Sequence, residues 1–295
     1  MTVAWRRFFL KSSVFASSFK AFLNRFSVYS VIVRGLLRCI GINFRLVLNE
    51  GIVTSKYLKQ YEKFYWQYLV KIFYKKADAV IVPTKAVGSD LHKNFGVPGG
   101  KIKIIPSWVP ENIEKVKKIV KKYDGIYVGR ISPEKGMEIL VDLAVAIKRK
   151  KLKFKMAIVG EGVMLDWLKA EVKRRSLENI LVLEGFKTHE EALDLIAASK
   201  VFLLPSSNEG LPMTVLEANA LGVPAVVLPF LGADEVVNDG KTGIIVDRGD
   251  YIKKVLATME DDRLIERMAK EAINYVKLNH SRRNLEAFIS VIFDE

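Results

Sequence analysis

The sequence has few of the residues that form covalent or metal-held frameworks. Its 295 residues include a single cysteine, Cys39, so no intrachain disulfide can form, which is compatible with a reducing compartment. The three histidines, His92, His189 and His280, are scattered and lack the spacing of a metal site. We expect each of them to be an ordinary surface or packing residue, and we expect no bound metal and no cofactor.

Long apolar runs are also missing. No uncharged stretch approaches the roughly 18 to 20 residues that a membrane-spanning helix needs. The N-terminus begins with basic and apolar residues, but Lys11 and Lys20 interrupt what would be the core of a signal peptide. We therefore expect a cytoplasmic protein, and its 50% hydrophobic and 27% charged residues are typical of a folded chain.

Acidic residues are scarce in the first part of the chain. Residues 1–122 hold 23 Lys and Arg against 6 Asp and Glu, whereas residues 123–295 hold 24 against 27, so the net charge of +14 comes entirely from the first part. A one-sided field of this kind attracts polyanions, whether nucleic acid, an anionic membrane surface or phosphorylated substrates. Charge alone does not choose among them.

Residues 4–27 predict a helix with an aromatic stripe and a basic opposite face. At 100° per residue, its five stripe residues fall within about 60° of each other. The membrane-facing set comprises Phe8, Phe15, Phe19, Phe22 and Phe26, together with Arg6, Arg7, Lys11, Lys20 and Arg25. This composition is typical of a helix lying in a membrane interface, and we favour that interpretation over a core-facing helix with a solvated back. It places the protein peripherally on the inner face of the membrane.

The remaining pattern predicts an α/β protein. In the first part we expect a helix over 55–76, strands over 45–49, 79–84 and 103–107, and a Lys-rich connection over 111–122, while 27–37 is compatible with strand or helix. Beyond 122, apolar strands alternate regularly with amphipathic helices. The strands are expected at 124–130, 154–160, 179–185, 201–207, 224–230 and 242–247, and the helices between them at 137–150, 164–175, 190–199 and 213–222. Such alternation predicts a doubly wound parallel sheet whose ligand lies at the carboxyl ends of the strands.

Two glycine-containing loops follow the first two strands of this domain. Gly129 lets backbone approach a ligand, and Arg130 and Lys135 supply two cations suited to a diphosphate, although an ordinary turn before a helix would fit the same residues. Gly160 begins a strand-to-helix turn whose helix N-terminus could face an anion. Each loop alone is a weak signal.

The segment 208–226 carries a more specific pattern. Glu209 lies in a loop at a strand end, and Glu217 lies eight residues on, two turns into the next helix. The amides from Gly210 open that helix and can meet phosphate or sugar oxygens. Carboxylates suit hydroxyl-rich ligands because each can accept two hydrogen bonds from a vicinal diol. Glu217 also has mainly apolar neighbours, so we expect it to have a partner rather than to be a solvated surface residue.

These motifs occur in the order that characterises one family. YVGRISPEKG, AIVGEG, VLEGF, VFLLPSSNEGLPMTVLEANALGVPAVV and DEVVNDGKTGIIV closely resemble the GT-B family of retaining glycosyltransferases known as family 4, over about residues 78–290. The resemblance implies that Arg130 and Lys135 bind the diphosphate and stabilise leaving-group charge, and that Glu209 holds donor-sugar hydroxyls. The further donor-binding residues include Gly129 and Gly160. The resemblance also implies that Phe186 and Lys187 lie beside the nucleobase, that the backbone of Gly210, Leu211, Pro212 and Met213 contacts sugar and phosphate, and that Glu217 holds the ribose diol.

The resemblance implies a GT-B fold with two Rossmann-like domains, the C-terminal one complete and the N-terminal one shortened. We expect a shortened acceptor or membrane-facing domain over 1–110, a linker over 111–122, the nucleotide-sugar domain over 123–282, and a last helix over 283–295 that returns to the first domain. The segment RLVLNEG matches a middle strand of the first domain, and Asn49 and Glu50 stand where the family often has a histidine.

The leading hypothesis is a membrane-associated, metal-independent retaining transferase that moves a sugar from a UDP- or GDP-linked donor to a lipid-linked or glycan acceptor. The alternative is a non-catalytic or partner-dependent subunit that binds donor and membrane, with another chain completing the acceptor site. A nucleic-acid partner is the weakest hypothesis, because no nucleic-acid-binding motif accompanies the basic residues.

Overall fold

The computed structural model describes residues 39, 45–60, 64–110, 113 and 120–293. The predicted helix over 4–27, with all its phenylalanines and basic residues, lies outside these residues, as does most of the connection over 111–122. The chain folds into two compact units, residues 1–105 with 288–295 and residues 106–287.

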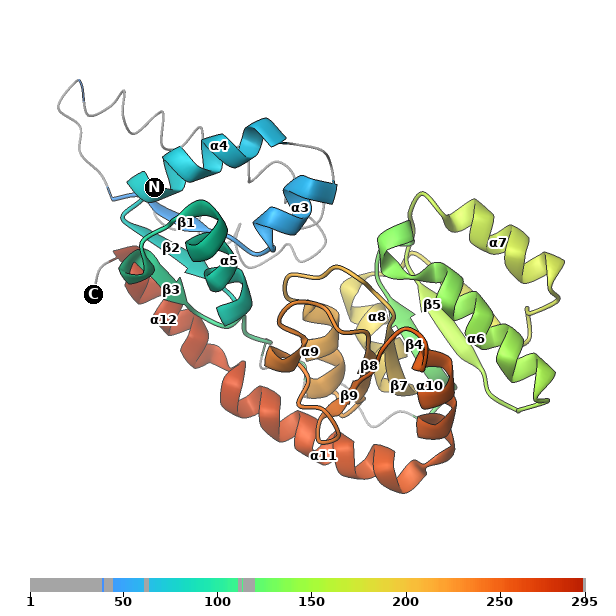
Figure 1. Cartoon of the computed structure of the whole chain (residues 1–295). Coiled ribbons are helices and arrows are strands. Elements are labelled where there is room, and N and C mark those ends of the chain that lie inside the picture. Colours follow the sequence, from blue (N-terminus) through green and yellow to red (C-terminus); the bar gives the residue numbers. More distant parts are fainter. Residues whose placement is uncertain (1–38, 40–44, 61–63, 111–112, 114–119, 294–295) are drawn as a thin grey trace. The chain divides into compact units, whose positions relative to one another are not determined.

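The first unit contains a three-stranded parallel sheet in the order β1-β2-β3 (Figure 1). Its strands are β1 (Val47–Asn49), β2 (Ala79–Val82) and β3 (Ile102–Ile104), and its helices are α3 (Thr54–Gln60), α4 (Phe64–Phe73) and α5 (Lys85–Phe95). All four residues of β2 are buried, as its continuous apolar run predicts. The helix expected over 55–76 is described as α3, α4 and a 3₁₀ turn over Tyr74–Lys76, with 61–63 outside the described residues.

Helix α5 was not predicted, although its ends follow ordinary capping chemistry. The side chain of Thr84 accepts a hydrogen bond from the amide of Val87 at 3.1 Å, and Gly96 closes the helix with φ of 66°. The helix lines one side of the small core with Val87, Leu91 and Phe95. Val87, Leu91 and Phe95 recur every four positions, so the helical periodicity is present in the sequence although the helix was not predicted.

The second unit contains a six-stranded, all-parallel sheet in the order β6-β5-β4-β7-β8-β9. Its strands are β4 (Tyr123–Val128), β5 (Met156–Val159), β6 (Leu181–Gly185), β7 (Ser199–Leu204), β8 (Ala225–Val227) and β9 (Gly243–Ile245). Its helices are α6 (Met137–Arg149), α7 (Leu165–Arg174), α8 (His189–Ala197), α9 (Met213–Ala220), α10 (Tyr251–Glu260) and α11 (Asp262–Asn279), and α12 (Arg282–Phe293) begins in this unit. Each strand expected beyond residue 122 is present.

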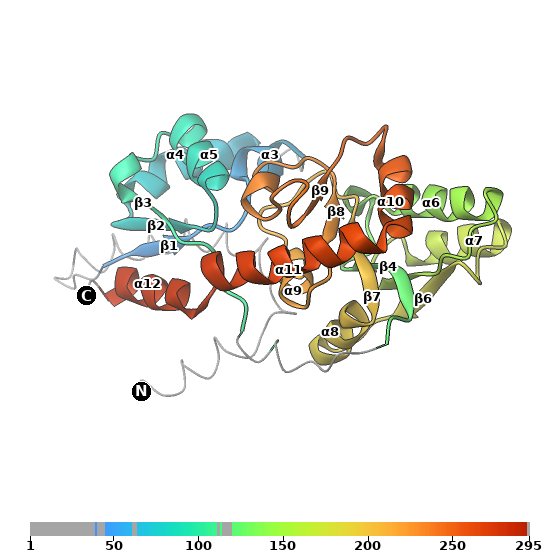
Figure 2. The same cartoon turned by 90° about the horizontal axis from the view of Figure 1, so that it is seen from below.

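Helices cover both faces of this sheet. Helix α6 packs beside α7 and α8 packs beside α9, and the two pairs lie on opposite sides of the strands (Figure 2). Strands β5 and β8 are therefore buried along their whole length, which explains their unbroken apolar sequences. None of the described helices is long and apolar enough to cross a membrane.

The order of the strands creates a switch point at the centre of the sheet. The chain runs outward from β4 through β5 to β6, and then returns to the other side of β4, where β7 pairs with it. In open α/β sheets the crevice at the carboxyl ends of the strands at such a point is the usual place for a ligand. The loops after β4 and β7 flank this crevice and therefore hold the candidate site.

Candidate functional site

Two predicted site residues meet across the switch point. Lys135 lies in the loop after β4 and Glu209 lies in the loop after β7, and the Nζ atom of Lys135 is 2.5 Å from Oε1 of Glu209. Their side chains are only 17% and 11% exposed. The sequence placed both residues at strand ends, and the strand order brings them into direct contact although they are 74 positions apart.

Glycines let these loops pack backbone to backbone. Gly136 has φ of 73°, and a Cβ atom there would lie 2.1 Å from the carbonyl oxygen of Pro205 in the loop after β7. At Gly160, after β5, a Cβ atom would lie 2.0 Å from the carbonyl oxygen of Gly129. The amide of Ser207 also donates to the carbonyl of Glu134 at 3.2 Å. The loop after β4 is thus held from both sides.

Arg130 provides a second cation at the carboxyl end of β4. Its side chain is exposed, and its guanidinium forms no ion pair with any other residue that the structure describes. Its backbone is held in place by a hydrogen bond that the hydroxyl of Tyr127 donates to the Arg130 carbonyl at 2.7 Å. Burial holds the pKa of Tyr127 well above its usual value, so this hydroxyl keeps its proton.

The start of α9 offers backbone donors beside Glu209. The amide groups of Gly210 and Leu211, which precede the N-cap Pro212, and of Met213, the first residue of α9, have no hydrogen-bond acceptor among the described residues. Pro212 has no N–H group, so its predicted role as a backbone donor is wrong. Leu211 is buried, so the amides of Gly210 and Met213, together with the positive end of the helix dipole, are the donors that an anion could meet.

Glu217 has the partner that its burial requires, and that partner was not predicted. The carboxylate is almost buried, and its Oε1 accepts a hydrogen bond from Nε2 of His189 at 2.9 Å. The prediction that His189 is an ordinary surface or packing residue did not include this contact. This hydrogen bond raises the pKa of His189. The two residues lie on different helices, α8 and α9, so nothing in their sequence spacing indicated the pair.

The end of β6 places Phe186 and Lys187 just before His189. The Phe186 side chain is 56% exposed, which leaves its ring face available for stacking. Lys187 instead turns towards β6, where its Nζ lies 3.8 Å from an oxygen of Glu184. Gly185 accepts a hydrogen bond from the amide of Gly160 at 2.8 Å, which links this loop to the one after β5.

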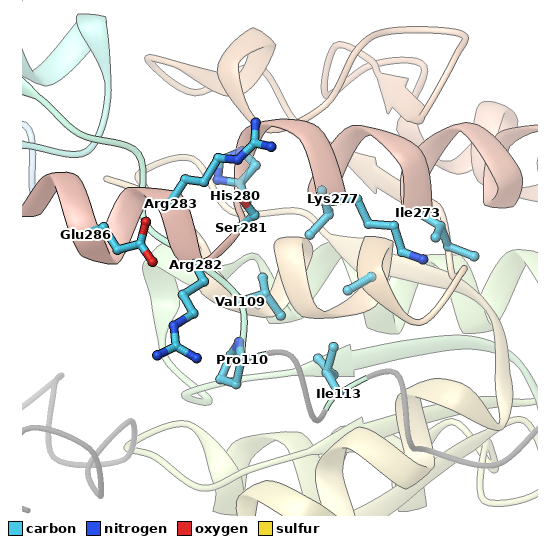
Figure 3. A pocket seen from close by; sticks show the side chains of 12 residues that line it. Val109, Pro110, Ile113, Ile273, Lys277, His280, Ser281, Arg282, Arg283 and Glu286 are labelled. Carbon is cyan, nitrogen blue, oxygen red and sulfur yellow. The ribbon is translucent and has the colours of Figure 1, made fainter.

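A cavity of about 430 Å³ lies elsewhere in the second unit, where α11 ends and α12 begins (Figure 3). Val109, Ile273, Lys277 and Arg282 line it, and none of the predicted site residues does. His280, also in its wall, is buried, its Nδ1 bonds to the carbonyl of Ser107 at 2.8 Å, and burial lowers its pKa. Because none of its lining residues belongs to the candidate site, the cavity is separate from that site.

In the first unit, Glu50 occupies the end of β1. It is 4% exposed, and its Oε2 accepts a hydrogen bond from the hydroxyl of Tyr74 at 2.8 Å. Burial raises the pKa of Glu50 to about 7. In the part of the chain that the structure describes, no three His, Cys, Asp or Glu side chains are grouped as a metal site.

The fold and the residues at the switch point are those of the GT-B glycosyltransferase family. The family model described as "Glycosyl transferases group 1" matches residues 109–275, and the model "Glycosyltransferase Family 4" matches residues 48–112. The chain belongs to the group 1 glycosyltransferase family, as its motifs predicted.

Individual relatives agree with this assignment. An uncharacterized glycosyltransferase of Methanocaldococcus jannaschii is 31% identical over 240 residues, which cover 77% of this chain and 61% of the relative. An N-acetylgalactosamine-N,N'-diacetylbacillosaminyl-diphospho-undecaprenol 4-alpha-N-acetylgalactosaminyltransferase of Campylobacter jejuni is 30% identical over 82% of this chain and 67% of its own length. The chain therefore spans less than two thirds of the archaeal relative. Anabaena HepE, crystallised with UDP and glucose, shares the fold with a TM-score of 0.74 at 21% identity, over 92% of this chain and 76% of HepE.

Proposed function

We propose that this chain transfers a sugar from a nucleoside-diphosphate sugar to a lipid-linked or glycan acceptor, with retention of configuration and without a metal ion. The observation that carries the proposal is the contact of Lys135 with Glu209 at the switch point, beside the free amides that open α9. Anabaena HepE with UDP and glucose, and the Campylobacter enzyme named for an undecaprenol-linked acceptor, support the donor and acceptor classes.

The donor would lie across the carboxyl ends of β4, β6 and β7. Arg130 and Lys135 supply the charge for the diphosphate, and the amides of Gly210 and Met213 add backbone donors. Glu209 holds hydroxyls of the donor sugar while it stays close to Lys135. Glu217 holds the ribose diol. The exposed ring of Phe186 stacks on the nucleobase, with Lys187 next to it and Gly129 and Gly160 leaving room for the diphosphate.

The chemistry needs charge stabilisation more than a protein nucleophile. The bond from the anomeric carbon to the diphosphate oxygen breaks, and the acceptor hydroxyl forms the new bond from the same face. The departing diphosphate takes the hydroxyl proton, so the charges and atoms balance without another base. Arg130 and Lys135 then stabilise the negative charge that grows on the diphosphate, and preorganised electrostatics of this kind is usually the largest contribution to such a rate.

A membrane surface fits the acceptor class and the charge distribution. Tyr68 and Ile72 on α4 are 72% and 53% exposed, and the exposed Lys71 and Lys75 lie close to them in sequence. We infer that this face, with the basic first part of the chain, lies peripherally on the anionic inner face of a membrane. The face defined by Tyr68, Lys71, Ile72 and Lys75 is called the α4 face below.

Calorimetric titration tests the donor site directly. The full chain is titrated with UDP, GDP and ADP, each with and without an attached sugar, and then the variant Glu217→Ala is titrated in the same way. We expect micromolar binding of one nucleotide and at least tenfold weaker binding of it by Glu217→Ala, because the ribose diol loses its carboxylate acceptor. Glu178→Ala, which changes an exposed acid of the same unit, should bind as the wild type does.

Two other results would contradict the proposal. Unchanged binding by Glu217→Ala would remove the ribose role from that residue. If the wild type bound no nucleotide, the proposal that the chain alone is a transferase would be wrong. The alternative, a partner-dependent subunit, would then be tested by adding a candidate partner chain to the same titration.

A further inference from the structure

His189 is placed by the structure of its own helix start. Thr188 caps α8 with a complete capping box, in which its side chain accepts from the amide of Glu191 and the Glu191 carboxylate accepts from the amide of Thr188. This box fixes the backbone on either side of His189, the first residue of the helix. The imidazole is 37% exposed and reaches α9 through its Nε2 atom.

Glu217 depends on this imidazole. Its side chain is 9% exposed, and among the described residues His189 is the side chain that contacts its carboxylate. A carboxylate can only accept, so Nε2 must carry the proton and donate to Oε1. The donated bond holds one oxygen of Glu217 in place and leaves the other, Oε2, free to accept from a further hydroxyl.

We propose that His189 is a positioning residue for donor binding: it orients the carboxylate of Glu217 towards the ribose diol of the nucleotide. This inference rests on the function proposed above. Without the imidazole, Glu217 would keep its place on α9 but would lose the hydrogen bond that selects its orientation and compensates its burial. The loss would then be felt only by ligands that carry the ribose hydroxyls.

A comparison of two ligands tests the proposal. UDP and 2′,3′-dideoxyuridine diphosphate are titrated into the full-length wild type, His189→Ala, His189→Gln, Glu217→Ala and the double variant His189→Ala with Glu217→Ala. We expect His189→Ala to weaken UDP binding about tenfold and to leave binding of the dideoxy nucleotide within about twofold of the wild type. His189→Gln keeps an N–H donor and should recover most of the UDP affinity.

The double variant separates positioning from a general structural effect. If His189 acts through Glu217, the double variant should bind UDP no more weakly than Glu217→Ala alone. Asp194→Asn is the matched control, because Asp194 is an exposed acid on α8 that is not among the groups acting on His189 or hydrogen-bonded to Glu217. It should bind both ligands as the wild type does.

Each contrary result has a distinct meaning. Equal losses for UDP and the dideoxy nucleotide in His189→Ala, or additive losses in the double variant, would overturn the positioning role while Glu217→Ala still reported on the donor site. Unchanged UDP binding in His189→Ala would overturn it as well. Failure of the wild type to bind UDP or any other nucleotide would instead contradict the proposed function.

Discussion

Arg130 and Lys135 are both cations at the end of β4, but their surroundings differ. Lys135 is already paired with Glu209 and is mostly covered, whereas Arg130 is exposed and forms no ion pair with a described side chain. A cation without an internal partner can respond fully to charge that develops on a leaving group. Arg130 is therefore the residue whose removal should affect the reaction most selectively.

We predict that Arg130→Ala lowers turnover by roughly a hundredfold and changes nucleotide affinity far less, because its charge is needed most when the diphosphate departs. The measurement is UDP release from the preferred nucleotide sugar, together with titration of UDP. Arg149→Ala, which removes an exposed arginine from the end of α6, should leave both values unchanged. Equal losses in turnover and affinity would assign Arg130 to ground-state binding.

Glu50 gives a pH-dependent prediction at the same scale. Its pKa is about 7 in the folded chain and about 4.5 in the unfolded chain, so the folded state binds the proton more tightly. The proton on Glu50 therefore stabilises the folded state. This stabilisation is complete below pH 4.5 and is lost as the pH rises through 7. We expect Glu50→Gln, which mimics the protonated form, to gain about 2 to 3 kcal/mol over wild type between pH 5 and pH 8.

Urea unfolding at pH 5 and pH 8, followed by a probe of the first unit such as the fluorescence of a tryptophan there, measures this difference. Asp142→Asn changes an exposed carboxylate on α6 and should show no comparable change with pH. A Glu50→Gln advantage that stays constant between the two pH values would contradict the buried, proton-binding state of Glu50.

The sequence identified single residues well where a motif carried them and poorly where only the fold did. Lys135 and Glu209 were recognisable because each lies in a family motif at a strand end. His189 was not, because its importance comes from a contact between α8 and α9 that no spacing along the chain encodes. The burial of Glu217 was predictable from its apolar neighbours, and it correctly implied a partner without revealing which one.

At the scale of elements, the regular strand and helix pattern beyond residue 122 was predictable because each β-strand there is apolar and short. The same pattern predicts that the sheet is parallel but does not predict the order of its strands, because many strand orders are compatible with alternating strands and helices. Helix α5 could have been predicted, because Thr84 and Gly96 are typical caps and its buried residues recur every four positions. The predicted helix over 4–27 stays a prediction.

The packing of the three loops gives a prediction for Gly136. In Gly136→Ala the new Cβ atom would meet the Pro205 carbonyl and force a residue with a side chain into φ of 73°. We expect a loss of about 1 to 3 kcal/mol in the free energy of unfolding and weaker UDP binding, because Lys135 is the preceding residue. Urea unfolding and UDP titration measure the two effects.

Gly249→Ala is the control for that substitution. No atom lies within 4 Å of a Cβ atom built at Gly249, so its stability should change by less than about 0.5 kcal/mol. If Gly136→Ala were as stable as wild type and bound UDP equally well, the loops after β4 and β7 would not need the close backbone contact seen here.

At the scale of the whole molecule, the uneven charge predicts salt-sensitive membrane binding. The full chain should float with vesicles that contain anionic phospholipid, should not float with neutral phosphatidylcholine vesicles, and should be released as salt rises, because screening weakens exposed charges. Replacing both Tyr68 and Ile72 by Ser should reduce flotation severalfold, since these residues give the α4 face its apolar area.

Val163→Ser is the matched control for that variant, because Val163 is 87% exposed but belongs to the second unit. It should float like wild type. Equal flotation by the Tyr68 and Ile72 double variant would exclude the α4 face from the membrane contact, and stronger binding to nucleic acid than to anionic vesicles would favour the rival partner.

The strand order also bears on how the chain acquires its site during folding. Lys135 and Glu209 are separated by 74 positions, and they meet only after β7 has returned past β5 and β6 to pair with β4. Closing so long a loop is slow compared with forming either half of the sheet, because its entropy must be lost before the contacts form. A chain in which only one half has folded has an ordered set of strands and no lysine–glutamate pair. Regain of the site during refolding therefore reports the joining of the two halves and not the folding of either one.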